Sequence, residues 1–448
     1  MSSVALRLRR LDLGAAAADA AQAADRRALV RRTAVPDGRV REVVRGILAD
    51  VRLRGDAAVR ETNARVGGGL PSGRLLLGSA ELADAREALE PALRRALETA
   101  IDNVRTFART QIPPTTRTMV VPGVEIERRW APIESVGCYV PGGTAPLPSS
   151  LIMAVVPAQV AGVGRIVVAT PAGADGTVDG VILGVAALLG LDAVLVAGGA
   201  QALAALAFGL PDEGLAPVDR IVGPGSTWVT AAKLELAGDV GIDLPAGPSE
   251  GLVLADESAD PRFVAADLLT QAEHGVDSPA ILVTTSPTVA DAVERELVRR
   301  LAEEPRAAIL ERSLAVHGRI VLAPSLDLAI EFVNDYAPEH LSVELRDEDL
   351  EPAVARLRNA GSLFVGRWAP ESAGDYATGA NHVLPTGGLA RSCGALSVDT
   401  FGKYVQVQRV SRDGLSALRA AITTLAEAEG LSAHGRAVEV RFDDRADR

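Results

Sequence analysis

The chain has 448 residues, 48% of them hydrophobic, and its 46 basic and 58 acidic side chains leave a formal net charge of −12. This length predicts two or three domains, and the acidic balance argues against nucleic acid as a partner. Neither of its two lysines, Lys233 and Lys403, stands in a G-x-x-x-x-G-K-[ST] frame, which excludes a Walker phosphate loop. Two distant cysteines predict a reducing, cytoplasmic setting, and no apolar run follows the arginines near the start, so no secretory signal is expected.

The first part of the chain predicts mainly helices. Residues 1–35 contain an alanine- and arginine-rich stretch, which predicts a helical N-terminal arm. Apolar spacing at three and four residues predicts long helices over 39–63 and 80–111. Residues 119–130 then predict extended strands that turn at Pro122-Gly123.

Alternation of strands and helices from about residue 137 to 244 predicts a parallel sheet with covering helices. Its expected strands are 165–170, 193–197 and 220–222, and its expected helices are 149–161, 178–189, 200–208 and 227–237. Residues 180–209 hold a single charge, Asp192, and hydropathy alone would suggest a membrane span there. We interpret that stretch instead as a buried helix, a turn, a strand and a second helix, because interior elements of an α/β fold are apolar on both faces.

A second α/β unit follows. Asp260 is a good N-cap with Pro261 at the first helical position, and this helix is expected to stop at Gly275. Strands are expected over 252–255, 280–285, 319–323 and 362–365, and helices over 287–304 and 414–429. We therefore expect an α/β fold with two Rossmann-like parallel-sheet domains, divided into 36–130 with 249–396, 131–248, and a small tail domain over 397–448.

Two of the five histidines stand in pairs of polar residues that suggest chemistry. Gln271 and His274 lie three apart near a helix end, so both face the same way and could ligate a borderline divalent metal. An ordinary helix end, with Gly275 as its cap, is the alternative. Glu339 and His340 follow a proline and offer two bases for proton removal from an alcohol and later from water; a solvated turn is the alternative there.

The remaining histidines give weaker signals. Asp375 and His382 stand in a glycine-rich segment that predicts a loop, where Asp375 is a candidate oxygen ligand and His382 a candidate proton handler or substrate contact. A plain polar loop explains them equally well. Glu429 and His434 lie in the tail, where a lone histidine is usually a surface residue, and His317 is interpreted as structural.

Three glycine-rich turns, 140–143, 197–199 and 222–225, follow expected strands, which is where parallel sheets bind ligands. The chain contains no strict G-x-G-x-x-G, so a standard Rossmann dinucleotide grip is not supported. Cys138 could serve as a covalent nucleophile, but its apolar neighbours predict a buried neutral thiol. The residues alone thus predict a soluble α/β enzyme with a possible His/Gln/Asp metal site, and no substrate.

Six longer segments carry a family resemblance. They are Gly137-Cys-Tyr-Val-Pro-Gly-Gly-Thr-Ala-Pro-Leu, Gly198-Gly-Ala-Gln-Ala-Leu-Ala-Ala-Leu-Ala-Phe-Gly, Pro245-Ala-Gly-Pro-Ser-Glu, Gln271-Ala-Glu-His-Gly, Asn334-Asp-Tyr-Ala-Pro-Glu-His-Leu and Gly374-Asp-Tyr-Ala-Thr-Gly-Ala-Asn-His-Val-Leu-Pro-Thr. In this order and spacing, from about residue 36 to the C-terminal region, the chain resembles the histidinol dehydrogenase family.

That resemblance implies an activity and a site. It implies the last step of histidine biosynthesis, in which histidinol becomes histidine through two NAD-dependent oxidations and an enzyme-held aldehyde. It implies one zinc ion per subunit, with Gln271, His274, Asp375 and His434 as its ligands. It implies Glu339 and His340 as the acid/base pair. The implied substrate contacts are Ser249, Gln271, His274, His340, Asp375, His382, Glu429 and His434.

The resemblance also implies a cofactor site and a dimer. Tyr139 and Gln201 match family positions for NAD, whereas Ser226 stands where relatives usually have asparagine. A degenerate Rossmann-like grip is implied, in agreement with the missing fingerprint. The family is a domain-swapped homodimer, so His434 would complete the zinc site of the partner.

Two other functions fit parts of the sequence. A zinc hydrolase would use Glu339 as the base for a metal-bound water. A non-catalytic ligand-binding homologue is a second alternative, which the intact matched positions disfavour.

Overall fold

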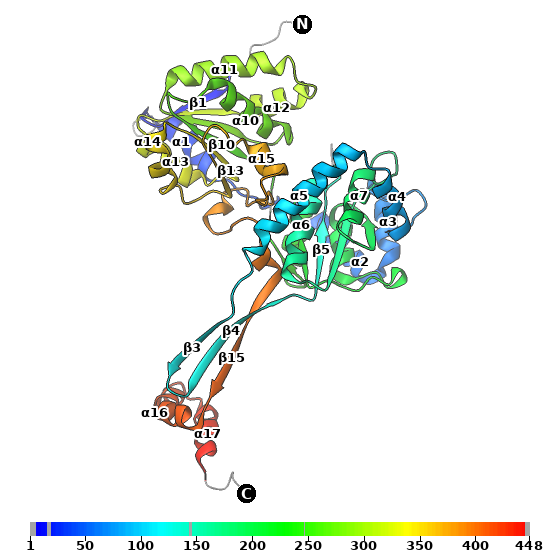
Figure 1. Cartoon of the computed structure of the whole chain (residues 1–448), viewed down its shortest axis with the longest axis vertical. Helices are drawn as coiled ribbons and strands as arrows, with labels where there is room; N and C mark the ends of the chain where they lie inside the picture. Colours follow the sequence, from blue (N-terminus) through cyan, green and yellow to red (C-terminus); the bar gives the residue numbers. More distant parts are fainter. Residues whose placement is uncertain (1–5, 16–18, 143–145, 246, 444–448) are drawn as a thin grey trace. The chain divides into compact units, whose positions relative to one another are not determined.

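The computed structural model describes residues 6–15, 19–142, 146–245 and 247–443 (Figure 1). The chain divides into two compact units. The main unit contains Met1–Gln111 and Ile133–Phe401, and the tail unit contains Ile112–Pro132 and Gly402–Arg448. In the described part of the chain, no helix is both long and apolar enough to cross a membrane.

The main unit holds two six-stranded sheets, of which the first, the β5 sheet, has the order β2-β7-β6-β5-β8-β9. Its strands are β2 (Leu76–Gly78), β7 (Ala193–Val196), β6 (Arg165–Thr170), β5 (Ser135–Tyr139), β8 (Arg220–Val222) and β9 (Gly241–Ile242). All neighbours pair in parallel except β2, which runs antiparallel to β7. The chain leaves β5 for β6 on one side and returns to β8 on the other, so the carboxyl end of β5 is a topological switch point.

Eight helices pack with the β5 sheet. One set consists of α2 (Gly38–Arg54), α3 (Asp56–Val66), α8 (Gly199–Phe208) and α9 (Thr227–Leu236), and another of α4 (Ser79–Glu87), α5 (Pro91–Arg109), α6 (Pro148–Ala161) and α7 (Gly180–Leu188). The apolar stretch over 180–209 therefore forms the expected helix, strand and helix, whose residues are mostly buried. The two long helices expected over 39–63 and 80–111 are each divided, the first at Gly55, which has a φ of 55°, and the second before Pro91.

The expected placement of residues 36–130 with residues 249–396 is wrong. Val44 and Leu48 of α2 share one core with Leu203 of α8 and Val229 of α9, so the segment 38–109 belongs to the β5 sheet. Amphipathic spacing shows that a helix has a buried face, but it does not show which sheet covers that face.

The second sheet, the β10 sheet, is entirely parallel in the order β1-β12-β11-β10-β13-β14. Its strands are β1 (Arg9–Asp12), β12 (Arg319–Leu322), β11 (Ala280–Thr284), β10 (Gly251–Ala255), β13 (His340–Glu344) and β14 (Ser362–Val365). Around it lie α1 (Ala20–Val30), α10 (Pro261–Glu273), α11 (Pro287–Leu301), α12 (Ala307–His317), α13 (Leu326–Tyr336), α14 (Asp347–Val354) and the short α15 (Glu371–Tyr376). Two apolar cores sandwich the sheet, as a doubly covered parallel sheet requires.

The N-terminal segment is not the separate helical arm that the sequence predicts. Residues 20–30 are helical, with Asp19 as the N-cap, but β1 adds a strand parallel to β12. Leu8 and Leu11 are buried in the two cores of the β10 sheet. The four residues of β1 are too few to show the alternation of apolar and polar residues that predicts a strand, so only its pairing with β12 identifies it. Residues 1–5 and 16–18 of the expected arm lie outside the described residues.

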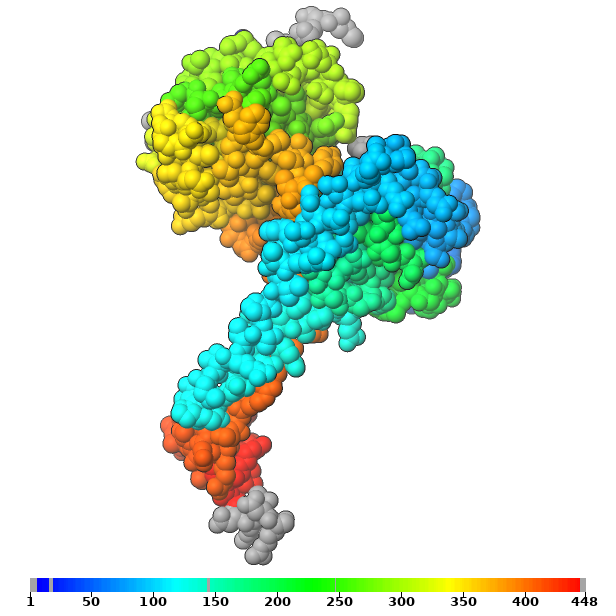
Figure 2. Space-filling view, in the orientation of Figure 1, coloured from blue at the N-terminus to red at the C-terminus, as the bar shows by residue number. Residues whose placement is uncertain are grey.

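The tail unit combines a β-hairpin from the middle of the sequence with the C-terminal segment. Its antiparallel sheet has the order β15-β4-β3, from β3 (Thr116–Val121), β4 (Val124–Pro132) and β15 (Gly402–Val410), followed by α16 (Arg412–Ala428) and α17 (Ser432–Glu439). The turn at Pro122-Gly123 is where the sequence predicts it, with a φ of 82° at Gly123. The expected tail boundary at residue 397 leaves out this hairpin. Figure 2 shows one face of the unit, with the hairpin in cyan.

Four short 3₁₀ turns complete the described elements. They are η2 (Pro211–Glu213), η3 (Leu389–Arg391), η4 (Val398–Phe401) and η5 (Val440–Phe442).

Candidate active site

Histidines and carboxylates gather at the amino ends of β10 and β13. His340 is the first residue of β13 and pairs in register with Gly251, the first residue of β10. His274 caps the C-terminus of α10, while Glu371 and Asp375 lie one turn apart on α15. The parallel strands β10 and β13 and the helices α10 and α15 bring together residues that are distant in the sequence.

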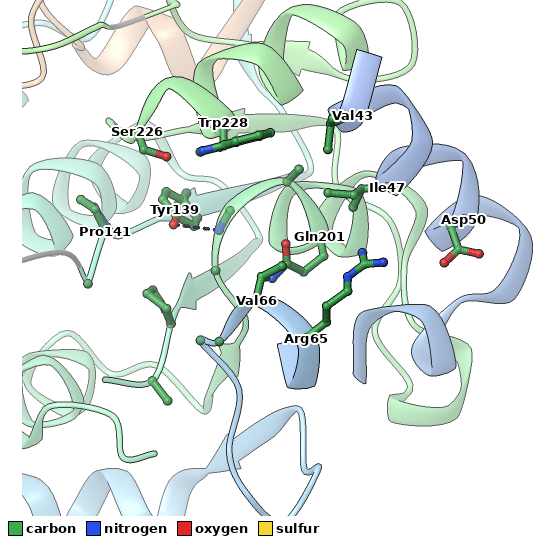
Figure 3. Close-up of a pocket in the computed structure, with 18 of the residues that line it drawn as sticks. Val43, Ile47, Asp50, Arg65, Val66, Tyr139, Pro141, Gln201, Ser226 and Trp228 are labelled. Carbon is green, nitrogen blue, oxygen red and sulfur yellow. Dashed lines mark hydrogen bonds between the residues drawn. The ribbon is translucent and has the colours of Figure 1, made fainter. Parts of the chain in front are cut away.

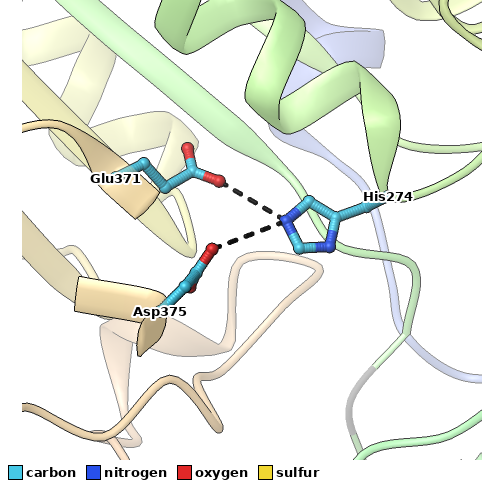
Figure 4. A group of neighbouring side chains, drawn as sticks. All are labelled: His274, Glu371 and Asp375. Carbon is cyan, nitrogen blue, oxygen red and sulfur yellow. Dashed lines mark ion pairs between the residues drawn. The ribbon is translucent and has the colours of Figure 1, made fainter. Parts of the chain in front are cut away.

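The cluster is tight and mostly buried. His274 Nε2 lies 3.6 Å from Glu371 Oε1 and 3.9 Å from Asp375 Oδ2, as Figure 4 shows. His340 Nε2 lies 3.7 Å from Asp375 Oδ1, and its Nδ1 lies 3.9 Å from Glu371 Oε1. Ligand atoms of His274, Glu371 and Asp375 all fall within 4.8 Å of one another, which is a spacing suited to a shared cation.

The carboxylates set the proton affinity of both imidazoles. Burial acts to lower the pKa of His274, but its hydrogen bond to Glu371 and the nearby charges outweigh burial and raise that pKa. The pKa of His340 is raised for the same reason, with burial opposed by the charges of Glu371 and Glu339. The surrounding carboxylates therefore favour the protonated form of each ring more than water does.

Gln271 lies on α10, three residues before His274, and its side-chain amide oxygen is free to bind a ligand. Its Nε2 donates to Ser249 Oγ at 3.3 Å, while its buried Oε1 has no hydrogen-bond partner among the described residues. A buried amide oxygen without a partner is costly, so the orphaned Oε1 fits a site that a metal ion would fill. The chemistry of the set, an amide oxygen, an imidazole and a carboxylate, suits a borderline cation such as zinc.

Gly251→Ala tests this arrangement. A Cβ at Gly251 would stand 2.7 Å from Gln271 Cγ and 2.8 Å from its Oε1, so the amide must move. We expect zinc affinity to fall about 10- to 100-fold, the usual effect of disturbing a ligand's support. Competition with a chelator measures that affinity. Gly238→Ala is the matched control, because nothing lies within 4 Å of a Cβ there; equal zinc affinity in both variants would contradict the prediction.

Glu339 and His340 are fixed by backbone contacts to the neighbouring strand. Glu339 Oε2 accepts from the backbone N–H of Glu250 at 2.8 Å, and the backbone N–H of His340 donates to the carbonyl of Glu250 at 3.2 Å. Arg32 holds Glu250 in turn, with hydrogen bonds of 2.7 and 2.5 Å to its two carboxylate oxygens. Burial raises the pKa of Glu339 to about 7, which suits a group that takes up and releases a proton near neutral pH.

His382 is buried beside the cluster. Its Nδ1 lies 2.9 Å from the carbonyl oxygen of Asp375 and its Nε2 lies 3.2 Å from Ser150 Oγ. Burial lowers the pKa of His382, which favours the neutral ring. A neutral imidazole between a carbonyl and a hydroxyl can orient a polar substrate group without adding charge.

The predicted residues of the main unit line two cavities. A cavity of about 590 Å³ is lined by Ser249, His274, Glu339, His340, Asp375 and His382, and Gln271 is buried next to it. A second cavity of about 870 Å³ is lined by Tyr139, Gln201 and Ser226 (Figure 3). Pro141 and Ser226 line both cavities, so the two cavities are neighbours at these residues.

The larger cavity lies at the carboxyl ends of β5 and β7, where the sequence predicts ligand-binding turns. Tyr139 ends β5, and its hydroxyl accepts from the backbone N–H of Gly199 at 3.1 Å. Gln201 Nε2 donates to Asn63 Oδ1 at 3.1 Å, which leaves its Oε1 as the atom available to a ligand. The α8 N-terminus at Gly198-Gly199 presents backbone N–H groups, the usual anion-binding feature of such folds.

The turn that carries Ser226 is held by a buried ion pair. Lys233 Nζ lies 2.6 Å from Asp243 Oδ1 and also donates to the carbonyl of Gly223. Asp243 Oδ2 accepts from the backbone N–H of Gly223 at 2.8 Å. Gly223 has a φ of 115°, and a Cβ there would stand 2.1 Å from the carbonyl oxygen of Tyr139. Only glycine allows this close approach.

Two predicted residues lie elsewhere, and one that the sequence did not single out joins the site. Glu429 and His434 belong to the tail unit, where both are exposed. Glu371 was missed because its segment predicts a loop; its spacing of four from Asp375 would have signalled two carboxylates on one helix face. Cys138 is fully buried and burial raises the pKa of its thiol, which confirms an inert cysteine.

The protein has two Rossmann-like sheets. One carries a cavity at its topological switch point, and the other carries the imidazole–carboxylate cluster. These features are typical of the class of α/β dehydrogenases. The family model for histidinol dehydrogenase matches residues 30–442. The histidinol dehydrogenase of Leifsonia xyli subsp. xyli is 47% identical over 93% of this chain and 96% of that protein, and that of Methanosarcina mazei is 41% identical over 95% and 97%. The crystal structure of histidinol dehydrogenase from Elizabethkingia anophelis superposes with a TM-score of 0.89 at 35% identity, covering 98% of this chain and 99% of that one.

The chain belongs to the histidinol dehydrogenase family.

Proposed function

We propose that this enzyme oxidises L-histidinol to L-histidine through histidinaldehyde, with two NAD⁺ and one zinc ion per subunit, as the last step of histidine biosynthesis in the cytoplasm. The observation that carries the proposal is the junction of the two cavities. We assign the larger cavity to the dinucleotide and the smaller one to the polar substrate, and the two share Pro141 and Ser226. Family membership supports the same activity.

Zinc would be held in the main unit by Gln271, His274 and Asp375, with Glu371 close enough to balance charge. His434 of the tail is the fourth proposed ligand. When bound, zinc supplies a Lewis acid that grips the amine and imidazole of the substrate and fixes the carbinol carbon in place. Ser249, His382 and Glu429 are the further proposed substrate contacts.

His340 accepts the hydroxyl proton of the alcohol while hydride leaves the carbinol carbon for NAD⁺. His340 takes part in this step as the neutral imidazole, with an unprotonated ring nitrogen facing the hydroxyl. Glu339 then takes a proton from water as the water oxygen bonds to the aldehyde carbon, and the protonated His340 returns its proton to the former aldehyde oxygen, which gives the hydrate. His340 takes the hydroxyl proton of the resulting hydrate as the second hydride leaves, and the carboxylic acid ionises. Histidinol, two NAD⁺ and one water thus give histidine, two NADH and three protons.

The direct test mixes zinc-loaded enzyme with limiting histidinol and excess NAD⁺. We expect two NADH per histidinol at 340 nm and one histidine by chromatography. No NADH from the zinc-loaded enzyme would refute the proposal, and hydrolysis of an ester or amide under the same conditions would favour the zinc hydrolase.

Glu339→Gln should separate the two oxidations. The amide can still accept the N–H of Glu250, but it cannot take a proton from water. We expect the first NADH to form and the second to slow by about 10²- to 10⁴-fold, so single turnovers yield one NADH per site. In the parent, the second oxidation should speed up as pH rises through about 7, because the carboxylate of Glu339 is the active form.

Glu344→Gln, at the end of β13 and outside both cavities, is the matched control and should yield two NADH. A Glu339→Gln enzyme that forms both NADH at the parent's rates would remove Glu339 from the mechanism.

The tail unit supports a domain-swapped homodimer. Met119 and Val120 of β3 are 59% and 57% exposed, and Leu425 of α16 is 64% exposed. Val124, Ala426 and Val438 are the apolar side chains that this unit buries among its described residues. So small a core and so much exposed apolar surface favour a unit that packs against a second copy of the chain.

Subunit mixing tests whether His434 acts in trans. His340→Gln and His434→Ala are each expected to be nearly inactive alone. In a mixed dimer with sharing across subunits, one of the two sites has both native residues, so co-refolding equal amounts should restore up to a quarter of parental activity. If each His434 served its own subunit, mixing would restore none.

A further inference from the structure

We infer that the indole ring of Trp228 stacks on the adenine ring of the bound dinucleotide. The adenosine half of NAD then lies in the larger cavity, and the nicotinamide lies beside the smaller one. The inference rests on the proposed use of NAD. Trp228 lies in the first turn of α9, two residues after Ser226, and lines the larger cavity. Trp228 is 43% exposed, so its indole ring is accessible from the cavity.

The orientation of the dinucleotide follows from the wall that the two cavities share. Hydride must pass from a carbon held beside His340 to the nicotinamide, so the nicotinamide lies at the Pro141 and Ser226 junction. The adenosine half is then left in the far part of the larger cavity. At about 870 Å³, that cavity is large enough for a nucleoside.

The far part of this cavity has the surfaces that a purine needs. Val43 and Ile47 of α2 supply an apolar wall near Trp228, and Figure 3 shows Gln201 and Val66 across the same space. A purine between an indole and aliphatic side chains gains both dispersion and burial, and base–aromatic stacking is worth about 1–3 kcal/mol per base in other proteins.

Fluorescence of the three tryptophans gives a readout that does not depend on turnover. AMP and ADP-ribose are the probes, titrated into the full-length protein. We expect both to quench the emission, and nicotinamide mononucleotide to quench it far less. Trp228→Phe should abolish most of the quenching while binding, followed by calorimetry, weakens by no more than about 3-fold.

Trp228→Ala should weaken ADP-ribose binding about 10-fold or more, since the ring face is lost. Trp368→Ala is the matched control: this indole is 85% exposed and lines neither cavity, so its removal should leave ADP-ribose affinity unchanged. Circular dichroism would show that all variants fold.

Three outcomes would overturn the inference. They are parental ADP-ribose affinity in Trp228→Ala, full quenching in Trp228→Phe, and stronger quenching by nicotinamide mononucleotide than by AMP. If any of these occurs while histidinol still yields NADH, the stacking role alone fails. If neither ADP-ribose binding nor NADH formation is seen, the proposed function fails with it.

Discussion

His340→Gln is expected to lower kcat by about 10²- to 10⁴-fold while zinc stays bound. His340 is the residue to which we assign both alcohol protons, and glutamine keeps a similar length without a basic nitrogen. Because the ring lies 6.0 Å from Phe364 and 6.3 Å from His274 in stacked arrangements, a side chain of similar size should leave the site assembled. Steady-state NADH formation with saturating histidinol and NAD⁺ measures the effect.

Metal analysis of the same samples shows whether the lower kcat of His340→Gln comes from lost proton transfer or from lost zinc. One zinc per subunit in an inactive His340→Gln enzyme supports a proton-transfer role. His317→Gln, on α12 and outside the cavity that holds His340, should retain parental activity. Parental kcat in zinc-replete His340→Gln would remove His340 from the mechanism.

Lys233→Met is expected to destabilise the fold by about 3–5 kcal/mol, because it leaves the carboxylate of Asp243 buried without its counter-charge. Both side chains of this pair are almost completely buried, at 2% and 0% exposure. The lost hydrogen bond to the Gly223 carbonyl should also loosen the turn that carries Ser226, so KM for NAD⁺ should rise. Urea unfolding followed by far-UV circular dichroism gives the free energy of unfolding.

The double variant Lys233→Met with Asp243→Asn is the control. It removes both charges, so we expect it to recover a substantial part of the lost stability. A single Lys233→Met variant within 1 kcal/mol of the parent would show that the pair contributes little to the fold. Lys403→Met, in the exposed part of β15, should have almost no effect.

Much of the fold follows from local patterns in the sequence. The alternation that predicts strands over 165–170, 220–222 and 362–365 is matched residue for residue by β6, β8 and β14. Asp260 and Pro261 start α10 as their cap chemistry predicts. These features depend on hydrophobic period and on capping, which act within a few residues, so sequence alone is sufficient to identify them.

Some residues of the site could also be predicted from the sequence, whereas others were identified only by the tertiary structure. Family strings indicated Gln271, His274, Asp375 and His434 as zinc ligands and His340 as a base. In the structure His274 and His340 both lie within 4 Å of Asp375, Gln271 hydrogen-bonds to Ser249 of the same cavity, and His434 belongs to the tail unit. Glu371 was missed because its glycine-rich segment predicted a loop, whereas the segment forms the short helix α15. The solvated turn that was the alternative at Glu339 and His340 does not form, because His340 begins the buried strand β13 and pairs with β10.

By itself, the sequence determined the α/β class, the position of most strands and helices, the inert nature of Cys138 and the residues that belong to the family's motifs. The tertiary structure alone decided that residues 38–109 cover the β5 sheet, that residues 9–12 extend the β10 sheet, and that the 116–132 hairpin pairs with the tail. The physical reason is that periodicity records only whether a face is buried. Which distant surface buries it depends on shape and packing between segments that no local pattern encodes.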